Sequence, residues 1–231
     1  MATSGTYTFN PSLGEITLYA YSLIGLRPTS LLQEHFEAAR MATNMMLATW
    51  SNRGVNLWSV DLVTTPLVTN QSTYSVPENT VVILDAYVTN DDSGALIDRI
   101  ILPVSRTEYA SYPNKDQQGF PTVFWFNRQT SPTITLWPVP NTDNGPQDLK
   151  YYRLMRLQDA GFQSGQSLNV PYLWLEAAAY ALAQRLAVIW APDKVTMLKP
   201  LADEAYNIAA EQNIETAQQY ISPMLGGYWR A

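Results

Sequence analysis

The hydrophobic period of the sequence changes twice along the chain, and these changes limit the folds that it can adopt. Apolar residues recur every three or four positions up to about residue 54, every second position from 55 to about 160, and at helical spacing again towards the C-terminus. A period near 3.6 predicts helices and a period of two predicts strands. We therefore expect helices at both ends of the chain and strands between them.

Two helices are predicted in the N-terminal part. The first extends from about Leu13 to Gly25, and a glycine at that place is typical of a helix end. Its apolar face contains Ile16, Ala20, Leu23 and Ile24. The second runs from Ser30, which would form a capping box with Gln33, to Gly54. Its apolar stripe contains Leu32, Phe36, Ala39, Thr43, Met46 and Trp50.

Short strand-like runs fill the middle of the chain. They include "STYSV", "TVVILDAYV", "ALIDRIILPVS", "TVFWFNR", "TITLWPVP" and "DLKYYRLMRL", separated by turn signals such as "TNDDSG" and "NTDNGP". Six or seven such strands are typical of a small sandwich or an open barrel.

Two further helices are predicted after residue 170. Pro171 suits the first turn of the third helix, and Asp193 is a candidate cap for the fourth, in which Pro200 predicts a kink or a break. The third helix is apolar on nearly every side, so it should be central. One face of it contains Leu175, Ala179, Leu182, Leu186 and Ile189.

These elements predict an α+β fold. We expect an antiparallel bundle of about four helices, an inserted small β-sandwich or barrel-like module, and an extended C-terminal arm. The expected segments are residues 1–54 for the N-terminal helices, 55–160 for the β module, 161–218 for the C-terminal helices and 219–231 for the arm. Since no low-complexity linker flanks the β module, we interpret it as an insertion into one helical bundle.

Composition excludes several kinds of chemistry. The chain has no cysteine, which excludes disulfides, thiolate metal sites and thiol nucleophiles. A formal net charge of −6 argues against tight binding to a phosphate backbone. The most apolar segment, residues 170–192, contains Glu176 and Arg185, so we expect a core helix and no contact with a membrane. The N-terminus does not resemble a secretory signal.

Catalytic and cofactor signatures are also missing from the sequence. The single histidine, His35, lies among glutamates on the second helix and is expected at the surface. The sequence has no zincin motif, nucleophile elbow or glycine-rich phosphate loop. The "NDDSG" turn lacks the alternating ligands of a calcium loop. We therefore predict no catalytic residues, no metal and no cofactor, and expect that the protein is not an enzyme.

Aromatic residues in the strands leave one alternative open. Side chains of this kind can stack on sugars, although inward placement in a β core is commoner. The residues concerned are Trp58, Phe124, Trp125, Phe126 and Trp137. A carbohydrate-binding module therefore stays an alternative, as does a cell-wall hydrolase that would use an unidentified acidic pair.

The order of the segments resembles that of a known family. The phrases "YSVP", "GFPTVFWF" and "LWPVP", with the helical segments around them, are similar to the head-to-tail adaptor (connector) proteins of tailed phages, including tail tubular protein A-like and packaged-DNA-stabilising proteins of short-tailed phages. The resemblance covers roughly residues 13 to 215.

This resemblance implies a structural virion protein at the capsid–tail junction, assembled in the host cytoplasm. Its partners would be the portal protein, a tail nozzle or tail tube protein, and other copies in a ring of about twelve. Double-stranded DNA would pass non-specifically through the channel of the ring during ejection. Twelve copies at −6 each carry a formal charge of −72, which repels phosphate.

Two sets of residues are candidates for these contacts. Three carboxylates lie along one side of the last helix, where they would either face solvent or line the DNA channel: Glu204, Glu211 and Glu215. The terminal "SPMLGGYWRA" would be a docking arm, since large apolar side chains are unusual at a free terminus. Its partner-binding residues would be Tyr220, Met224, Leu225, Tyr228 and Trp229.

Overall fold

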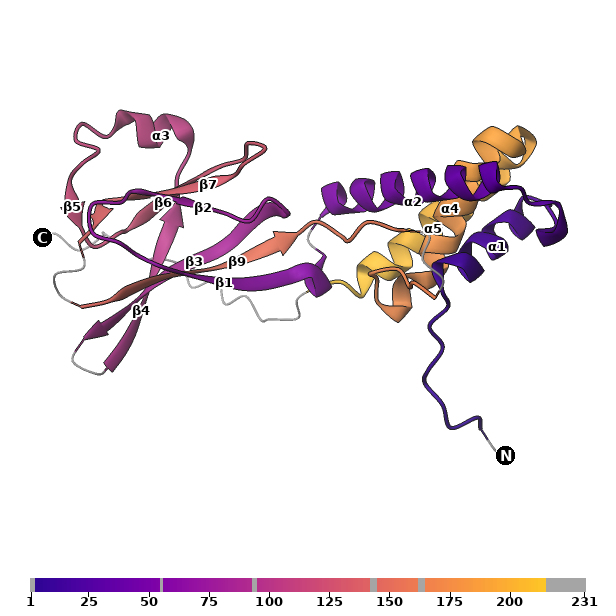
Figure 1. Ribbon diagram of the computed structural model, residues 1–231, viewed down its shortest axis with the longest axis horizontal. Coiled ribbons are helices and arrows are strands. Elements are labelled where there is room, and N and C mark those ends of the chain that lie inside the picture. The colour runs from indigo at the N-terminus through magenta and orange to yellow at the C-terminus, as the bar shows by residue number, and fades with distance from the viewer. Residues whose placement is uncertain (1–2, 55, 93–94, 142–144, 162–164, 215–231) are drawn as a thin grey trace, which may run out of the picture.

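The computed structural model describes residues 3–54, 56–92, 95–141, 145–161 and 165–214 of the 231-residue chain (Figure 1). The helices formed by these residues are α1 (Leu13–Leu23), α2 (Gln33–Arg53), α3 (Arg106–Ser111), α4 (Leu175–Trp190) and α5 (Val195–Glu211). The strands are β1 (Val60–Pro66), β2 (Thr73–Ser75), β3 (Thr80–Asp92), β4 (Ala95–Pro103), β5 (Gln118–Gly119), β6 (Val123–Asn127), β7 (Thr133–Trp137), β8 (Val139–Pro140) and β9 (Gln147–Met155).

Seven of the strands form one curled mixed sheet. Their order is β1-β9-β3-β4-β6-β7-β2, in which β4 and β6 run parallel and the other neighbours run antiparallel. β5 and β8 form a separate parallel pair. The sheet encloses its own core, which contains Val88, Ile101, Phe124, Ile134, Leu136, Leu149 and Tyr151. Because these residues alternate with more exposed ones along the strands, the period of two in the sequence is explained by one buried face.

The predicted fold class is therefore wrong. A curled seven-stranded sheet shaped like a half-barrel, accompanied by five helices, replaces the expected helical bundle with a small sandwich or barrel-like insert. The strand runs were recognisable in the sequence, but a period of two does not reveal which strands pair. The parallel contact of β4 with β6, which follows the short helix α3, joins all seven strands into one sheet instead of two packed sheets.

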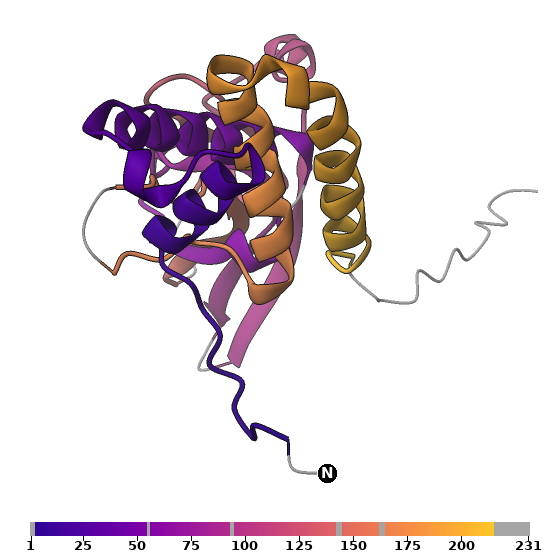
Figure 2. The same cartoon turned by 90° about the vertical axis from the view of Figure 1, so that its right-hand side faces the viewer.

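The long helices pack at one end of the sheet around α4 (Figures 1 and 2). Figure 2 shows α4 with α1 and α2 on one side and α5 on the other. α4 is rich in alanine, and its buried residues are Leu175, Ala177, Ala178, Ala179, Ala181, Leu182, Ala183, Leu186 and Ala187. Small side chains on both sides of this helix allow its neighbours to approach closely, so the prediction of a central third helix is confirmed.

The ends of the helices agree in part with those predicted from the sequence. Gly25 lies just after α1 with a φ of 88°, a conformation that glycine adopts without strain, and Gly54 follows the last residue of α2. The capping box forms at α1 instead of α2. Ser12 caps α1, and the Glu15 carboxylate accepts hydrogen bonds from the backbone N–H and the hydroxyl of Ser12 at 2.7 and 2.8 Å. Ser30 belongs to a short 3-10 turn and does not cap α2.

His35 caps α2 in place of Ser30. Its Nδ1 accepts the backbone N–H of Leu32 at 3.1 Å. The imidazole stacks on the Trp190 ring with centroids 4.2 Å apart, and the Tyr21 hydroxyl donates to the backbone carbonyl of His35 at 2.5 Å. The expectation of a surface histidine is therefore wrong: His35 is buried where α1, α2 and α4 meet. The glutamates beside it in the sequence face outward, because neighbouring positions on a helix point in different directions.

Three details of the last two helices also differ from expectation. Ile189 is 58% exposed, although the sequence pattern groups it with the buried residues Leu182 and Leu186 on one apolar face of α4. Asp193 lies in a 3-10 turn and makes no side-chain cap for α5. Pro200 lies inside α5, which continues unbroken to Glu211.

A matched pair of substitutions tests the packing of α4. Leu182 is fully buried, so Leu182→Ala should lower the free energy of unfolding by about 2–5 kcal/mol through lost burial and a residual cavity. Ile189→Ala, on the same helix, should change it by less than about 0.5 kcal/mol. Urea denaturation of both variants measures the difference, and equal effects would contradict this orientation of α4.

The buried Tyr21 predicts a loss of stability at high pH. Burial raises the pKa of its hydroxyl to about 12, so between about pH 10 and 12 the folded chain retains a proton that the unfolded chain has lost. The free energy of unfolding should therefore fall as the pH rises through this window. At neutral pH the free energy of unfolding of the wild type should exceed that of Tyr21→Phe by about 1 kcal/mol, because the variant lacks the hydrogen bond to the His35 carbonyl.

The measurement is chemical denaturation of both proteins from pH 7 to 12. The advantage of the wild type should disappear towards pH 12, since the phenylalanine variant cannot ionise at this position. If the difference in free energy of unfolding between the two proteins stayed constant from pH 7 to 12, the burial of the Tyr21 hydroxyl would be contradicted. Other tyrosines contribute equally to both proteins, so the comparison isolates residue 21.

Candidate functional site

An apolar groove of about 660 Å³ lies on the helical part of the molecule. It is formed by α1, the start of α4, α5 and the segment before α1. Five of its apolar side chains are more than half exposed: Phe9, Tyr19, Tyr172, Leu173 and Ile208. Large apolar side chains that gather at one place on a surface mark sites of contact with other molecules.

Two carboxylates line this groove, Glu15 and Glu176. The hydrogen bonds from the Ser12 N–H and hydroxyl lower the pKa of Glu15, so that its charge serves the start of α1. Glu176 lies near Tyr180, whose pKa is raised first by neighbouring Tyr19, then by burial and by Glu176. The groove thus combines aromatic and aliphatic side chains with a negative rim, an arrangement that suits the binding of another chain.

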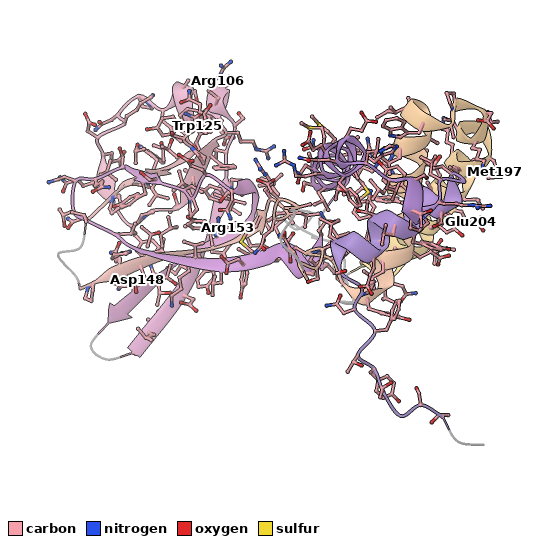
Figure 3. The ribbon with its side chains drawn as sticks, turned by 45° about the vertical axis from the view of Figure 1, so that its right-hand side comes forward. Arg106, Trp125, Asp148, Arg153, Met197 and Glu204 are labelled. Carbon is pink, nitrogen blue, oxygen red and sulfur yellow. The ribbon has the colours of Figure 1, made fainter. Side chains whose placement is uncertain are left out.

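The predicted acidic face of the last helix is present on α5. Glu204 and Glu211 are both exposed and are separated by two helical turns, while Leu198 and Ala209 are buried. Figure 3 places Glu204 on the helical part of the molecule, away from the sheet residues Trp125 and Asp148. Glu215 lies outside the residues that the structure describes. The assignment of this face to a DNA channel stays a prediction.

The proposed partner-binding residues of the C-terminal arm also lie outside the described part of the chain: Tyr220, Met224, Leu225, Tyr228 and Trp229. The last described residue, Ile214, is an exposed apolar side chain just beyond α5. The role of the arm therefore stays a prediction as well.

Two tryptophans of the sheet, Trp125 and Trp137, stack on tyrosines from α3 and the residue that follows it. Tyr109 and Trp125 lie 5.7 Å apart with an interplanar angle of 22°, and Tyr112 and Trp137 lie 4.3 Å apart at 24°. The ammonium group of Lys115 is 5.4 Å from the Tyr109 ring centroid. Because the tyrosines come from α3 and the following residue, this short helix covers one face of each tryptophan, a face that a sugar would otherwise use.

The other three aromatic residues of this prediction have structural surroundings. Phe124 is buried in the core of the sheet, and Phe126 packs against that core. Trp58 packs with Trp174 at a centroid distance of 4.9 Å, and its Nε1 donates to the carbonyl of Asn169 at 3.3 Å. Trp58 therefore belongs to the helical core and not to the sheet. None of these positions supports the carbohydrate-binding alternative.

Two arginines are partly or fully withdrawn from solvent. Arg153 on β9 is buried, where it pairs with Asp61 of β1 at 3.1 Å and donates to Asn79 at 2.6 Å. Arg185 on α4 donates to Thr49 on α2 at 3.2 Å, and its pKa is lowered by burial and by neighbouring Arg53. Both side chains join separate elements, so we interpret them as structural residues.

Metal and membrane sites have no support in the described segments. Among these residues, no three acidic or histidine side chains form a cluster that could hold a metal ion. No helix within the same ranges is both long and apolar enough to cross a membrane.

The groove residues were missed by the sequence analysis, although a signal was present. Tyr19 lies off the buried stripe of α1, and Tyr172 and Leu173 lie just before α4. A large apolar residue on the outer side of an amphipathic helix is a candidate contact residue. The sequence does not reveal that these residues meet, because they come from segments about 150 positions apart.

Comparison with known proteins gives one family. No curated protein matches the chain. The family model described as SU10 adaptor protein matches residues 23–224, which include α2, every strand, α4 and α5. This match agrees with the resemblance to phage adaptors that the order of the segments indicates. The chain belongs to the SU10 adaptor protein family, a family of structural adaptor proteins of phages.

Proposed function

We propose that the protein is a head-to-tail adaptor that forms a ring beneath the portal of a tailed phage. The ring would join the portal to the tail nozzle or tail tube and leave a channel for DNA. The match to the SU10 adaptor family over residues 23–224 is the observation that carries this proposal. The finer resemblance to tail tubular protein A-like adaptors of short-tailed phages, and the number of twelve copies, are parts of the proposal.

Exposed apolar surface supports a role in assembly. Tyr172 and Ile208 are exposed at the groove of the helical part, and Leu96 and Ile100 are exposed on β4 of the sheet. A single chain of this kind exposes apolar side chains at both of its ends, whereas soluble monomers usually keep such patches small. A ring subunit needs contact surfaces of this kind towards its neighbours and towards the portal or tail.

We also propose a division of labour along the chain. Residues 1–54 and 161–218 would form one structural unit and residues 55–160 the other, with residues 219–231 as the docking arm. Two separate buried clusters, one among the long helices and one inside the sheet, support this division, with Trp58, Leu157 and Ala160 at its borders packing with the helical cluster. The arm would insert Tyr220, Met224, Leu225, Tyr228 and Trp229 into the portal or a neighbouring copy, since large apolar anchors dominate many interfaces.

Charge supports a channel that does not retain DNA. At a formal −6 per copy, a ring of twelve would repel the phosphate backbone. We place Glu204, Glu211 and Glu215 on the channel wall in this proposal. DNA would then pass without the counterion release that tight binding requires.

Removal of the arm tests the docking proposal. Deletion of residues 219–231 should leave the free energy of unfolding within about 0.5 kcal/mol of the wild type, because both buried clusters of the described residues are complete without the arm. Attachment to the cognate portal, measured by co-sedimentation, should be lost. A variant whose last ten residues are replaced by glycine and serine controls for length. Attachment by either variant at wild-type strength would contradict the docking arm.

Two charge variants test the channel wall. The first variant combines Glu204→Lys with Glu211→Lys, and the control combines Glu37→Lys with Glu108→Lys. Both make the same charge change at exposed helical positions. In assembled rings, only the first variant should gain DNA binding that weakens steeply with salt. Titration of labelled duplex DNA from about 50 to 200 mM salt measures this difference. Equal binding by both variants would mean that α5 does not line the channel.

A further inference from the structure

The strand β4 has an open edge along most of its length. β3 pairs with β4 over Ala95–Ile101, but β6 reaches only Leu102 and Pro103 on the other side. Among the strands that the structure describes, none lies along the rest of that side. Figure 1 shows the hairpin of β3 and β4 projecting beyond the body of the sheet, so this edge is accessible.

The direction of the backbone groups follows from one hydrogen bond. The Leu102 N–H donates to the Thr122 carbonyl at 3.0 Å, on the side where β6 lies. Backbone groups in a strand alternate between its two sides, so Leu96, Asp98 and Ile100 direct their N–H and C=O groups towards the open edge. These groups can accept one further strand.

Two large apolar and exposed side chains lie beside this edge, on either side of Asp98. Leu96 and Ile100 are 72% and 79% exposed, and they lie on one face with Leu102. The outer strands of the sheet carry features that oppose further pairing: β2 has three residues, and β1 ends in Pro66. β4 has nine residues, and its proline, Pro103, lies where β6 already pairs, outside the open stretch Ala95–Ile101. An open edge of this length, with apolar side chains on both sides of Asp98, is a template for pairing with another chain.

The N-terminal segment of the chain supplies a suitable strand. Residues 3–10 belong to no helix or strand and form an exposed segment, in which Gly5 has a φ of 65°. The run Thr6–Phe9 consists only of threonine and aromatic residues, which favour strands. Tyr7 is 102% exposed, so its side chain is not covered by any described part of its own chain. Phe9 instead packs against Tyr172, with ring centroids 6.4 Å apart, and anchors the base of the segment.

The two features lie on different parts of the molecule. Figure 1 shows the N-terminal segment leaving the helical part and pointing away from it, while the β3–β4 hairpin projects from the sheet at the other end. The six residues before Phe9 reach at most about 20 Å. A second copy of the chain is therefore the natural supplier of the strand for this edge.

We propose that residues 3–8 of one copy add as a strand to the open edge of β4 in a neighbouring copy. Tyr7 then lies beside Leu96 and Ile100, because side chains on the same face of neighbouring strands are in contact. The contact joins two different surfaces, so it can repeat from copy to copy, and it forms a ring where the rotation between neighbouring copies closes. This inference rests on the proposed function, since it assigns the contact between copies within the adaptor ring.

Disulfide trapping tests the contact directly. The native chain has no cysteine, so Tyr7→Cys and Ile100→Cys each introduce a single thiol. Mixed in equal amounts, assembled on the portal and oxidised, the two variants should give a cross-linked dimer that contains one of each. In the control, Val188→Cys replaces Ile100→Cys, because Val188 is 60% exposed but lies on α4. This control should give at least ten-fold less cross-linked dimer with Tyr7→Cys.

A proline substitution tests the backbone pairing. Ile100→Pro removes an N–H that faces the open edge and leaves the hydrogen bonds to β3 in place. It should raise the concentration needed for ring assembly at least ten-fold, while the circular dichroism spectrum of the monomer stays that of the wild type. Ile100→Val keeps the N–H and should assemble normally. If Ile100→Pro disturbs the monomer, deletion of residues 2–8 tests the same contact from the other copy.

The outcomes separate this inference from the proposed function. Failure of the wild type to assemble on a portal would overturn the proposed function and this inference with it. Normal rings from the proline and deletion variants, with no Tyr7–Ile100 cross-link, would overturn the inference alone. Cross-linking of Ile100→Cys to a different tail protein would also overturn it, because the edge would then receive another partner.

Discussion

Close packing around α4 is the constraint on which the helical part depends. This helix contacts α1, α2 and α5, and alanine occupies many of its buried positions, including Ala178, Ala183 and Ala187. Small side chains allow neighbouring backbones to approach, whereas larger ones would push the neighbours apart. With α1 and α5 held on the same central helix, their outer residues Tyr19 and Ile208 come together at one groove. The surface available to partners is therefore a consequence of the packing beneath it.

The sheet and the helices are joined through the ends of β1 and β9. Asn44 of α2 donates to the carbonyl of Ala160 at 3.1 Å and accepts its N–H at 2.8 Å, which holds the segment after β9 against α2. The ion pair of buried Arg153 with Asp61, whose side chain is 43% exposed, connects β9 to β1 near the same end. Removing Asp61 would leave the buried guanidinium without this partner, so the pair constrains how the two strands meet. The half-barrel is thus tied to the helices at the place where the chain enters and leaves it.

The chemistry of the described residues is that of contact surfaces. The stacked pairs between α3 and the sheet use one face of Trp125 and of Trp137 internally, and His35 supplies a helix cap and a stacked ring instead of a reactive imidazole. The unpaired features are apolar side chains at the groove and a free backbone edge on β4. Adaptor proteins need such features, since they act by holding other proteins together. Membership of the SU10 adaptor family is consistent with this distribution.

The sequence alone determined the order of helices and strands, the helix ends at Gly25 and Gly54, the central place of α4 and the resemblance to phage adaptors. These properties depend on local periodicity, on glycine conformation and on the order of short segments, all of which are present in the linear chain. Tertiary structure decided that seven strands form one curled sheet and that His35 is buried against Trp190. It also decided where β4 is left without a partner. Strand pairing and burial depend on residues far apart in the chain, and a local pattern carries no information about which of them will meet.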